Sequence, residues 1–364
     1  MKIKEIAAFF EKLAPLMYQE SYDNSGLQLG DYSRDVKGAL ITLDVTEEVI
    51  DEAIEKGLDL IISHHPVIFG GVKSLTGKNM TERIILKAIK NDISIYSAHT
   101  NLDVVPGGVS GRMCEELGLK KCRILDPTTG QLKKLVVFVP ISHADKVREA
   151  LFTAGAGVIG NYDSCSFNAE GSGTFRGDEN TNPYAGTKGE LHSESEVRIE
   201  TIFPAHVKGQ LITAMIQAHP YEEVAYDIYS LENKYPKLGM GMMGELEEPM
   251  EEGEFLNVLK KTFHCGIIRH SALTGKKVKK VALCGGAGSS LLRKAIAEKA
   301  DFFISGDFKY HQFFDAESKI VIADIGHFES EQYTRNLIYD LLIKNLPKFA
   351  VQLSEINTNP IKYF

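Results

Sequence analysis

The sequence predicts an α/β fold in which one discontinuous domain is interrupted by a smaller α+β domain. Short apolar runs alternate with helical patterns at the start of the chain, the alternation changes near residue 130, and it resumes after about residue 250. A chain of 364 residues also exceeds the usual size of a single hydrophobic core. We therefore expect residues 1–130 and 250–364 to form one α/β domain, with a sheet and flanking helices, around an insert at 131–249.

The composition is that of an ordinary soluble protein. It is 43% hydrophobic and 25% charged, and the net charge of −8 without a long basic run argues against nucleic acid as a partner. The five cysteines are scattered and never form a CxxC pair, which argues against a disulfide framework and a thiolate zinc site. The first segment predicts an amphipathic helix and not a signal peptide, and no apolar run is long enough to cross a membrane. We expect a cytoplasmic protein without a membrane partner.

The first part of the chain predicts strands and helices in alternation. In chain order these are a helix over 3–13, a strand over 38–45, a helix over 47–56 capped by Thr46, a strand over 58–62, a helix over 82–90 capped by Thr81, a strand over 93–98 and a helix ending at 119. This order predicts a parallel sheet with right-handed crossovers, in which ligands collect at the carboxyl ends of the strands.

Candidate ligand residues follow two of these strands directly. His64 and His65 follow the strand over 58–62, and His99 and Asp103 follow the next one. Neighbouring side chains on an extended segment point to opposite sides, so the two adjacent imidazoles can face two metal positions. A lone His-His pair is more simply two solvated loop residues, but the shared placement at strand ends favours a site.

The middle of the chain predicts a ferredoxin-like module of βαββαβ type. Its expected elements are a strand over 135–139, a helix over 145–154, a Gly/Ser/Asn-rich stretch over 155–189, a strand over 196–203, a helix over 206–219 and a strand over 225–231. Residues 219–223, His-Pro-Tyr-Glu-Glu, are typical of a structural turn. Residues 235–254 predict a return linker whose glutamates lie on the solvated surface: Glu247, Glu248, Glu251, Glu252 and Glu254.

The last part of the chain returns to the α/β pattern. We expect strands over 279–284, 302–305 and 320–323, a helix over 291–300 and a long helix from about Phe328. His327 and Glu331 are four residues apart and would share one helix face, as an ion-holding pair or as a plain surface pair. Because they lie beyond another strand end, we favour the interpretation as an ion-holding pair.

These residues together predict a metal site. The proposed ligands are His64, His65, Asp103, His327 and Glu331. Three imidazoles and two carboxylates suit Zn, Fe, Mn, Co or Ni, and two such ions sharing a hydroxide would support hydrolysis.

Other polar residues have weaker signals. His99 is a candidate general acid/base, and Asp307, Lys309 and His311 are candidate partners of the ligands or ordinary loop residues. The glycine-rich segment 285–290 favours a tight turn over a phosphate loop, and Cys284 is expected in the core.

Five short motifs occur in a fixed order along nearly the whole chain. They are Ser63–Pro66 (SHHP), His99–Asp103 (HTNLD), Cys284–Gly288 (CGGAG), Ser305–Asp307 (SGD) and Gly326–Glu331 (GHFESE). In this combination the chain resembles the type 2 GTP cyclohydrolase I family, also called NIF-three-like proteins. The middle region resembles the insert of the longer bacterial members (the YqfO type), which is similar to CutA and PII folds.

The resemblance implies a NIF-three-like domain with two divalent metal ions per subunit on the five matched ligands, bridged by Glu331, in a toroidal homohexamer. Where the family usually has Trp before Asp-Asn-Ser-Gly, this chain has Tyr22, which would alter the pocket and leave the metals untouched.

The first functional hypothesis is a metal-dependent hydrolase that uses a metal-bound hydroxide on a small-molecule substrate, with GTP ring opening as the nucleotide reaction to test and His99 as proton shuttle. The alternative is a metal-handling or metal-sensing protein without turnover, and a third hypothesis is a hexameric scaffold with structural metals. Open coordination positions would favour the enzyme.

Overall fold

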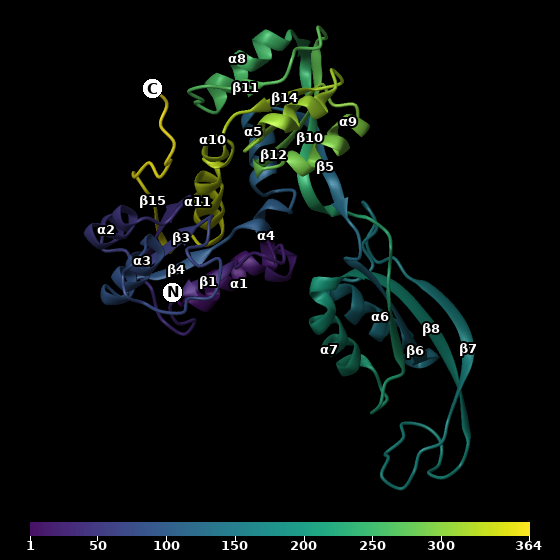
Figure 1. The fold of residues 1–364 in the computed structure, drawn as a ribbon. Coiled ribbons are helices and arrows are strands. Elements are labelled where there is room, and N and C mark those ends of the chain that lie inside the picture. The colour runs from purple at the N-terminus through teal and green to yellow at the C-terminus, as the bar shows by residue number, and fades with distance from the viewer. The chain divides into compact units, whose positions relative to one another are not determined.

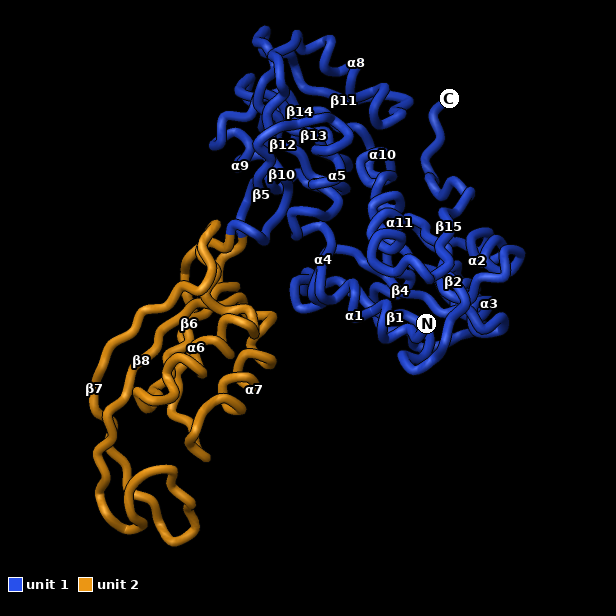
Figure 2. The backbone as a smooth tube through the Cα atoms, turned by 180° about the vertical axis from the view of Figure 1, so that it is seen from behind, with its two compact units in different colours: residues 1–127, 236–364 blue, residues 128–235 orange.

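The computed structural model describes residues 1–364, which form two compact units (Figure 2). Unit 1 comprises Met1–Pro127 and Pro236–Phe364, and unit 2 comprises Thr128–Tyr235. Unit 1 holds two separate sheets where the sequence pattern predicts one sheet with flanking helices. The apolar periodicity of a strand does not encode which other strand it pairs with, so the division into two sheets is not visible in the sequence.

The first sheet of unit 1 is mainly parallel and is built from the start of the chain. Its strand order is β1-β4-β3-β2-β15, with β1 antiparallel and the other pairs parallel. The strands are β1 Gly26–Leu29, β2 Gly38–Thr42, β3 Leu60–Ser63, β4 Ser94–Ser97 and β15 Ala350–Leu353. In register, Thr42, Ser63 and Ser97 lie side by side, so the carboxyl ends of β2, β3 and β4 meet at one edge.

Helices cover both faces of this sheet, and several lie beside it in Figure 1. They are α1 Ile3–Leu13, α2 Glu47–Glu55, α3 Met80–Lys90 and α11 Thr334–Asn345, with the short α4 Thr100–Asp103 and the 3-10 turn η1 Leu16–Tyr18 nearby. Side chains of α2 and α3 share a buried cluster with Leu40, Ile61 and Ile95, whereas Phe10 of α1 stacks on Tyr96, which points the other way. Thr46 caps α2 as expected, but Asn79 and not Thr81 caps α3, because the helix begins one residue before Thr81.

The second sheet of unit 1 contains six strands in the order β11-β14-β13-β12-β10-β5. The strands are β5 Lys120–Thr128, β10 Tyr235–Met250, β11 Arg269–His270, β12 Val278–Ala287, β13 Phe302–Gly306 and β14 Val321–Asp324. Its helices and 3-10 turns are α5 Val109–Glu116, α8 Glu252–Thr262, η4 Ser289–Leu291, α9 Leu292–Ala297, η5 Tyr310–Ala316 and α10 His327–Glu331. Strands β12, β13 and β14 are parallel, and Ser305 and Asp324 are paired where β13 and β14 end.

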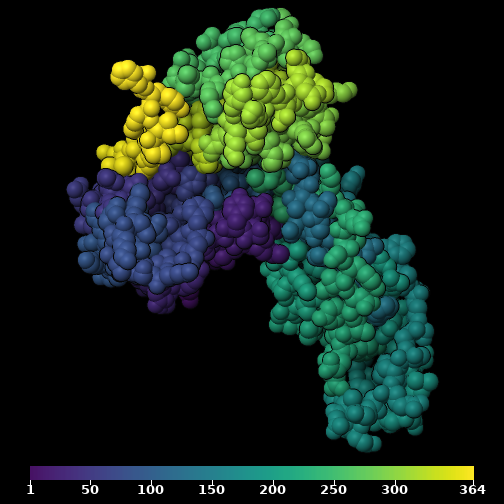
Figure 3. Space-filling view, in the orientation of Figure 1, coloured from purple at the N-terminus to yellow at the C-terminus, as the bar shows by residue number.

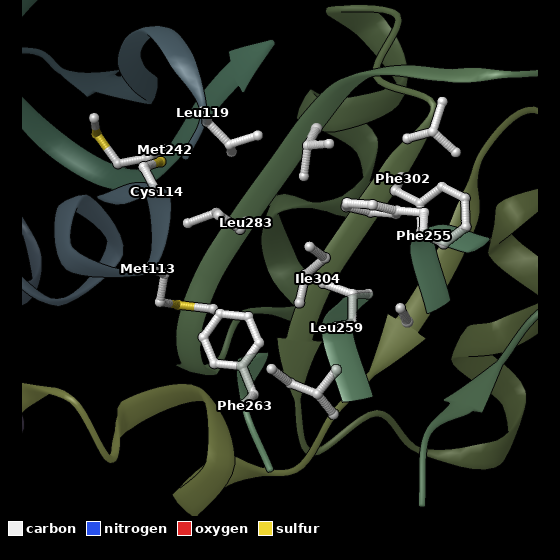
Figure 4. Packing of buried hydrophobic residues seen from close by; sticks show 14 of the residues in the cluster. Met113, Cys114, Leu119, Met242, Phe255, Leu259, Phe263, Leu283, Phe302 and Ile304 are labelled. Atoms are coloured by element: carbon white, nitrogen blue, oxygen red, sulfur yellow. The ribbon is translucent and has the colours of Figure 1, made fainter. Parts of the chain in front are cut away.

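An extended apolar cluster of unit 1 packs on the second sheet (Figure 4). Phe255 of α8 meets Phe302 of β13 edge to face, with ring centroids 5.0 Å apart. Met113 of α5 and Phe263 close the same cluster around Leu283. This packing places the carboxyl ends of β12, β13 and β14 on a rigid base.

Residues 235–254 are not a linker, which corrects the sequence prediction. Most of the segment is strand β10, which pairs antiparallel with β12 and buries Leu238, Met242 and Met243. Its glycines and acidic residues are typical of a loop, but its apolar side chains pack into the second sheet. Glu252 is also buried and accepts hydrogen bonds from Thr274 and Gly275, so it is not a solvated surface residue.

Unit 2 is an α+β module with the element order β6, α6, β7, β8, α7, β9. The bounds are β6 Leu132–Pro140, η2 Ile141–His143, α6 Ala144–Thr153, β7 Phe167–Phe175, β8 His192–Pro204, η3 Ala205–Val207, α7 Lys208–Ala218 and β9 Tyr226–Ser230. The antiparallel sheet has the order β7-β8-β6-β9, as expected for a βαββαβ chain. Its core lies between the sheet and the two helices, where Leu135, Val147 and Leu211 are fully buried.

The C-terminal end of the chain lies on the surface of unit 1, shown in yellow in Figure 3. Ahead of this end, the side chain of Thr358 donates a hydrogen bond to Asp44, and Asn359 donates one to Glu329 of α10. No helix in the structure has the length and apolar character needed to span a lipid bilayer.

Candidate metal centre

Four histidines of unit 1 converge from the carboxyl ends of three strands. His64 and His65 follow β3, His99 follows β4, and His327 begins α10 after β14. The ring centroids of His65 lie 4.9 Å from His64, 5.3 Å from His99 and 5.3 Å from His327. The parallel strands of both sheets therefore direct their imidazoles to one place, although His65 and His327 are far apart in sequence.

Each of these imidazoles is held by its Nδ1 atom. Nδ1 of His64 lies 2.8 Å from the carbonyl oxygen of Ala98, and Nδ1 of His65, His99 and His327 lies 2.7 Å from a carboxylate oxygen in each case. The three carboxylates are those of Asp44, Asp23 and Asp307, respectively. Because these oxygens only accept, each Nδ1 donates, and in the neutral ring the lone pair is left on Nε2.

Three of the Nε2 atoms, those of His64, His65 and His327, lie around the carboxylate of Glu331. One of its oxygens, Oε2, lies 3.0 Å from Nε2 of His65 and 3.1 Å from Nε2 of His327, and the other, Oε1, lies 3.8 Å from Nε2 of His64. Oδ1 of Asp103 lies 3.6 Å from the same atom of His64. The two oxygens of Glu331 thus face different imidazoles, an arrangement that suits a bridging carboxylate.

The donor atoms form two overlapping groups that could hold a metal ion. One group is His64, His65 and His99, and the other is His65, His327 and Glu331; the ligand atoms within each group lie within 4.8 Å of one another. The sequence prediction placed His99 beside the ligands, as a proton shuttle, whereas the geometry places its free Nε2 among them.

Two polar atoms at this centre, Nε2 of His64 and Oδ1 of Asp103, are buried without a hydrogen-bond partner. Oε2 of Glu331 is also buried and makes no hydrogen bond, although it lies at ion-pair distance from His65 and His327. Burying such atoms without a partner is costly, so their occurrence together indicates that something else satisfies them. Imidazole nitrogens and carboxylate oxygens are the donors that divalent transition metals take in proteins. The residues present therefore fit divalent metal ions.

The electrostatics of the centre follow from its buried carboxylates. Burial opposes a positive charge on His65, but Asp44 and Glu331 outweigh burial and raise the pKa of His65 to about 10. His327 is balanced in the same way by Asp307 and Glu331, which raise its pKa to about 11. Burial raises the pKa of Asp103, whereas the nearby imidazoles outweigh burial and hold the pKa of Glu331 well below its usual range. The site thus holds an ionised carboxylate that requires positive charge beside it.

The glycine-rich segment 285–290 begins in the last three residues of β12, makes room for Glu331 and offers no free phosphate loop. Gly286 has a φ of +60°, and a Cβ atom there would lie 2.3 Å from Oε1 of Glu331. The N–H groups of Gly286 and Gly288 donate to the hydroxyls of Ser330 and Ser305. The expected tight turn over 285–290 is shorter than predicted, because β12 continues to Ala287 and the 3-10 turn η4 begins at Ser289. Cys284 is buried as expected, with burial raising its pKa to about 12.

Of the three residues predicted as possible partners of the ligands, only Asp307 contacts a ligand imidazole. Asp307 contacts His327, but His311 packs against Tyr310 and Phe314, away from the imidazoles. Lys309 caps the turn η5. Asp44 and Asp23, which hold His65 and His99, were not predicted as partners. Asp44 lies two residues beyond the end of β2 at the same sheet edge, which is the signal that could have found it.

Comparisons with known proteins agree with this architecture. The family model of Duf34/NIF3 (NGG1p interacting factor 3) matches residues 1–360. A Halalkalibacterium halodurans protein named GTP cyclohydrolase 1 type 2 homolog is 42% identical over 363 residues, covering 98% of each chain. A Bacillus subtilis protein of the same name is 41% identical over 368 residues, covering 99% of this chain and 98% of its own.

Solved structures extend the likeness to the whole chain. A Bacillus cereus protein related to NIF3 superposes with a TM-score of 0.86 at 41% identity, covering 100% of this chain and 99% of its own. A Staphylococcus aureus protein superposes with a TM-score of 0.79 at 32% identity, with the same coverage.

Proposed function

This chain belongs to the Duf34/NIF3 family, and we propose that it is a metal-dependent hydrolase that holds two divalent ions on His64, His65, Asp103, His327 and Glu331. The observation that carries the proposal is the set of buried donor atoms without partners at the point where the imidazoles of both sheets meet. The relatives are named as homologues of GTP cyclohydrolase 1 type 2, so GTP is the first substrate to test.

The side chains of this centre have separate tasks in the proposed site. Asp44, Asp307 and the Ala98 carbonyl orient the ligand imidazoles through Nδ1, so that each Nε2 faces inward. His64 and Glu331 are almost fully buried, whereas the side chain of His327 is 35% exposed. Substrate would therefore approach from the side of His327.

Divalent ions bound here would supply Lewis acidity and lower the pKa of a water molecule toward about 7. His99 would hold or transfer a proton at Nε2, because Asp23 fixes the proton on Nδ1. As an alternative to that role, its position within the donor group of His64 and His65 makes His99 a candidate fourth imidazole ligand of the centre.

The proposal also covers the oligomeric state of the protein and the fold of unit 2. A toroidal homohexamer and a CutA- or PII-like unit 2 follow from the resemblance. Sedimentation of the purified chain tests the first: a hexamer mass is expected, and a stable monomer contradicts it.

The functional test is turnover with matched variants. The full chain, loaded in turn with Zn, Mn, Fe, Co or Ni, is incubated with GTP and a panel of phosphoesters, and products are separated by chromatography. We expect turnover by the wild type that is lost in Glu331→Ala and retained in His311→Ala, whose ring lies away from the centre. Metal retention without turnover above the Glu331→Ala control, with every metal, would instead support a metal-handling or metal-sensing protein.

A further inference from the structure

Unit 2 contains a cavity of about 580 Å³ that is separate from the metal-binding residues. It lies on the face of the sheet that α6 and α7 do not cover. Val137 and Val197 point into the core beneath those helices. The alternate residues Phe138, Glu196 and Arg198 point the other way and line the cavity.

Aromatic rings form one wall of this cavity, with Tyr221 at their centre. The ring centroid of Tyr221 lies 5.7 Å from that of Phe175 and 6.0 Å from that of Tyr184. The turn that carries Tyr221 is fixed by His219, whose Nε2 donates to the carbonyl of Phe138 while its Nδ1 accepts from the N–H of Tyr221. The wall is therefore held in place by hydrogen bonds within unit 2.

A buried carboxylate faces the same cavity. Glu196 is only 7% exposed, and the hydroxyl of Tyr221 donates to its Oε1 over 2.9 Å. No lysine, arginine or histidine forms an ion pair with Glu196 in the described chain. Gly173 leaves room for the second oxygen, because a Cβ atom there would lie 2.2 Å from Oε2. A carboxylate that is buried against a single neutral donor lacks the counter-charge that such groups usually have.

The other charged residues that line the cavity do not neutralise its negative charge. Four glutamates line it against two arginines, Arg176 and Arg198. Arg198 is already paired with Glu200, over 2.9 Å. The lining is therefore net negative, and a cation is the ligand that its charge favours.

We propose that unit 2 binds an organic ammonium ion in this cavity, with the cationic group against Glu196 and the rings of Tyr221, Phe175 and Tyr184. Aromatic faces attract cations, and a desolvated carboxylate beside them adds charge complementarity. The cavity has the volume of a small-molecule site and would hold the apolar part of the ligand. The inference does not depend on the proposed hydrolase activity.

Binding to the full chain can be measured by calorimetry with paired probes. Choline is compared with dimethylbutanol, in which carbon replaces the nitrogen, and phenethylammonium is compared with phenethyl alcohol. We expect at least one ammonium probe to bind saturably, about tenfold or more tighter than its neutral partner. This preference should be lost in Glu196→Gln, which keeps the shape of the side chain and removes its charge.

The matched control is Glu194→Gln, which changes a glutamate of the same strand that pairs with His192 outside the cavity lining. It should bind like the wild type, and circular dichroism with thermal unfolding checks that each variant is folded. The proposal is overturned if neither ammonium probe saturates below about 50 mM, if the neutral partners bind equally well, or if folded Glu196→Gln keeps the preference.

Discussion

The imidazoles at the strand ends are oriented by hydrogen bonds from their Nδ1 atoms to other residues. His65 and His327 each donate through Nδ1 to an aspartate, Asp44 and Asp307, and both present Nε2 to one oxygen of Glu331. The aspartates come from other segments of the chain, so the imidazole orientation depends on the folded sheets. Partners of this kind usually affect metal affinity strongly.

Substituting Asp44 tests this dependence. We expect Asp44→Ala to lower metal affinity about 10- to 100-fold, because the imidazole of His65 loses the acceptor that fixes its tautomer and orientation. Competition with a chromogenic chelator measures the affinity. Asp31→Ala is the control, since Asp31 only accepts hydrogen bonds from Ser33 in an exposed turn. Equal metal affinity in the two variants would mean that Asp44 does not orient His65.

The candidate metal centre also requires a glycine at position 286, because a side chain there would overlap Glu331. We expect Gly286→Ala to displace Glu331 and to reduce bound metal, because the new methyl group would overlap Oε1 of that carboxylate. Gly275→Ala is a matched control: its φ of +74° carries a similar backbone strain, but nothing lies within 4 Å of the added Cβ. Metal content by plasma mass spectrometry separates the two effects, and an equal loss in both variants would contradict the steric account.

The sequence predicted the positions of the inward-facing residues because they follow a general rule for parallel sheets. His64 and His65 follow β3 directly and His327 follows β14 closely, whereas Glu331 lies one helical turn beyond His327 in α10. Asp23 was harder to find, because the turn that carries it precedes β1 and meets His99 only in the tertiary structure. The roles of His64, His65, His327 and Glu331 as metal ligands stay predictions.

At the scale of helices and strands, buried apolar strands were predicted, whereas exposed or irregular strands were not. The strands β2, β3, β4, β13 and β14 coincide with buried apolar runs. Strand β7 is almost wholly exposed, and β15 and β10 alternate or contain glycine and proline, so their strand character comes from pairing with neighbours.

Helix α2 is tied to the segment after β15 by one buried carboxylate. Glu52 accepts hydrogen bonds from the hydroxyl of Ser354 and the N–H of Glu355, and it pairs with Lys56 at 2.8 Å. Burial would raise the pKa of Glu52, but these partners outweigh burial and hold it below its usual value of 4.5. The ionised carboxylate therefore stabilises the fold above that pH, and the contribution is lost as the pH falls through the lowered pKa.

We expect Glu52→Gln to destabilise the protein by about 1–2 kcal/mol near neutral pH. The difference from the wild type should shrink as the pH falls below about 4.5 and through the lowered pKa of the folded protein, where the wild-type carboxyl also becomes neutral. Urea unfolding at a series of pH values measures this difference. A deficit that stays constant down to acidic pH would show that the charge of Glu52 is not its cause.

At the scale of the whole molecule, unit 1 assembles the candidate metal centre from segments that are distant in sequence. The first sheet provides His64, His65, His99 and Asp103, and α10 beyond the second sheet provides His327 and Glu331. The C-terminal end links both sides again, through Thr358 to Asp44 and through Asn359 to Glu329. Unit 2 is inserted between Pro127 and Pro236 and carries its own core and cavity.

The central claim is that this convergence exists to hold metal ions, and elemental analysis of the purified full chain tests it most directly. After dialysis against metal-free buffer, we expect the wild type to retain about two divalent ions per chain and Glu331→Gln to retain markedly fewer, since one carboxylate faces the imidazoles of both sheets. A wild type that retains no ion after loading, or a folded Glu331→Gln that retains as many as the wild type, would contradict the account.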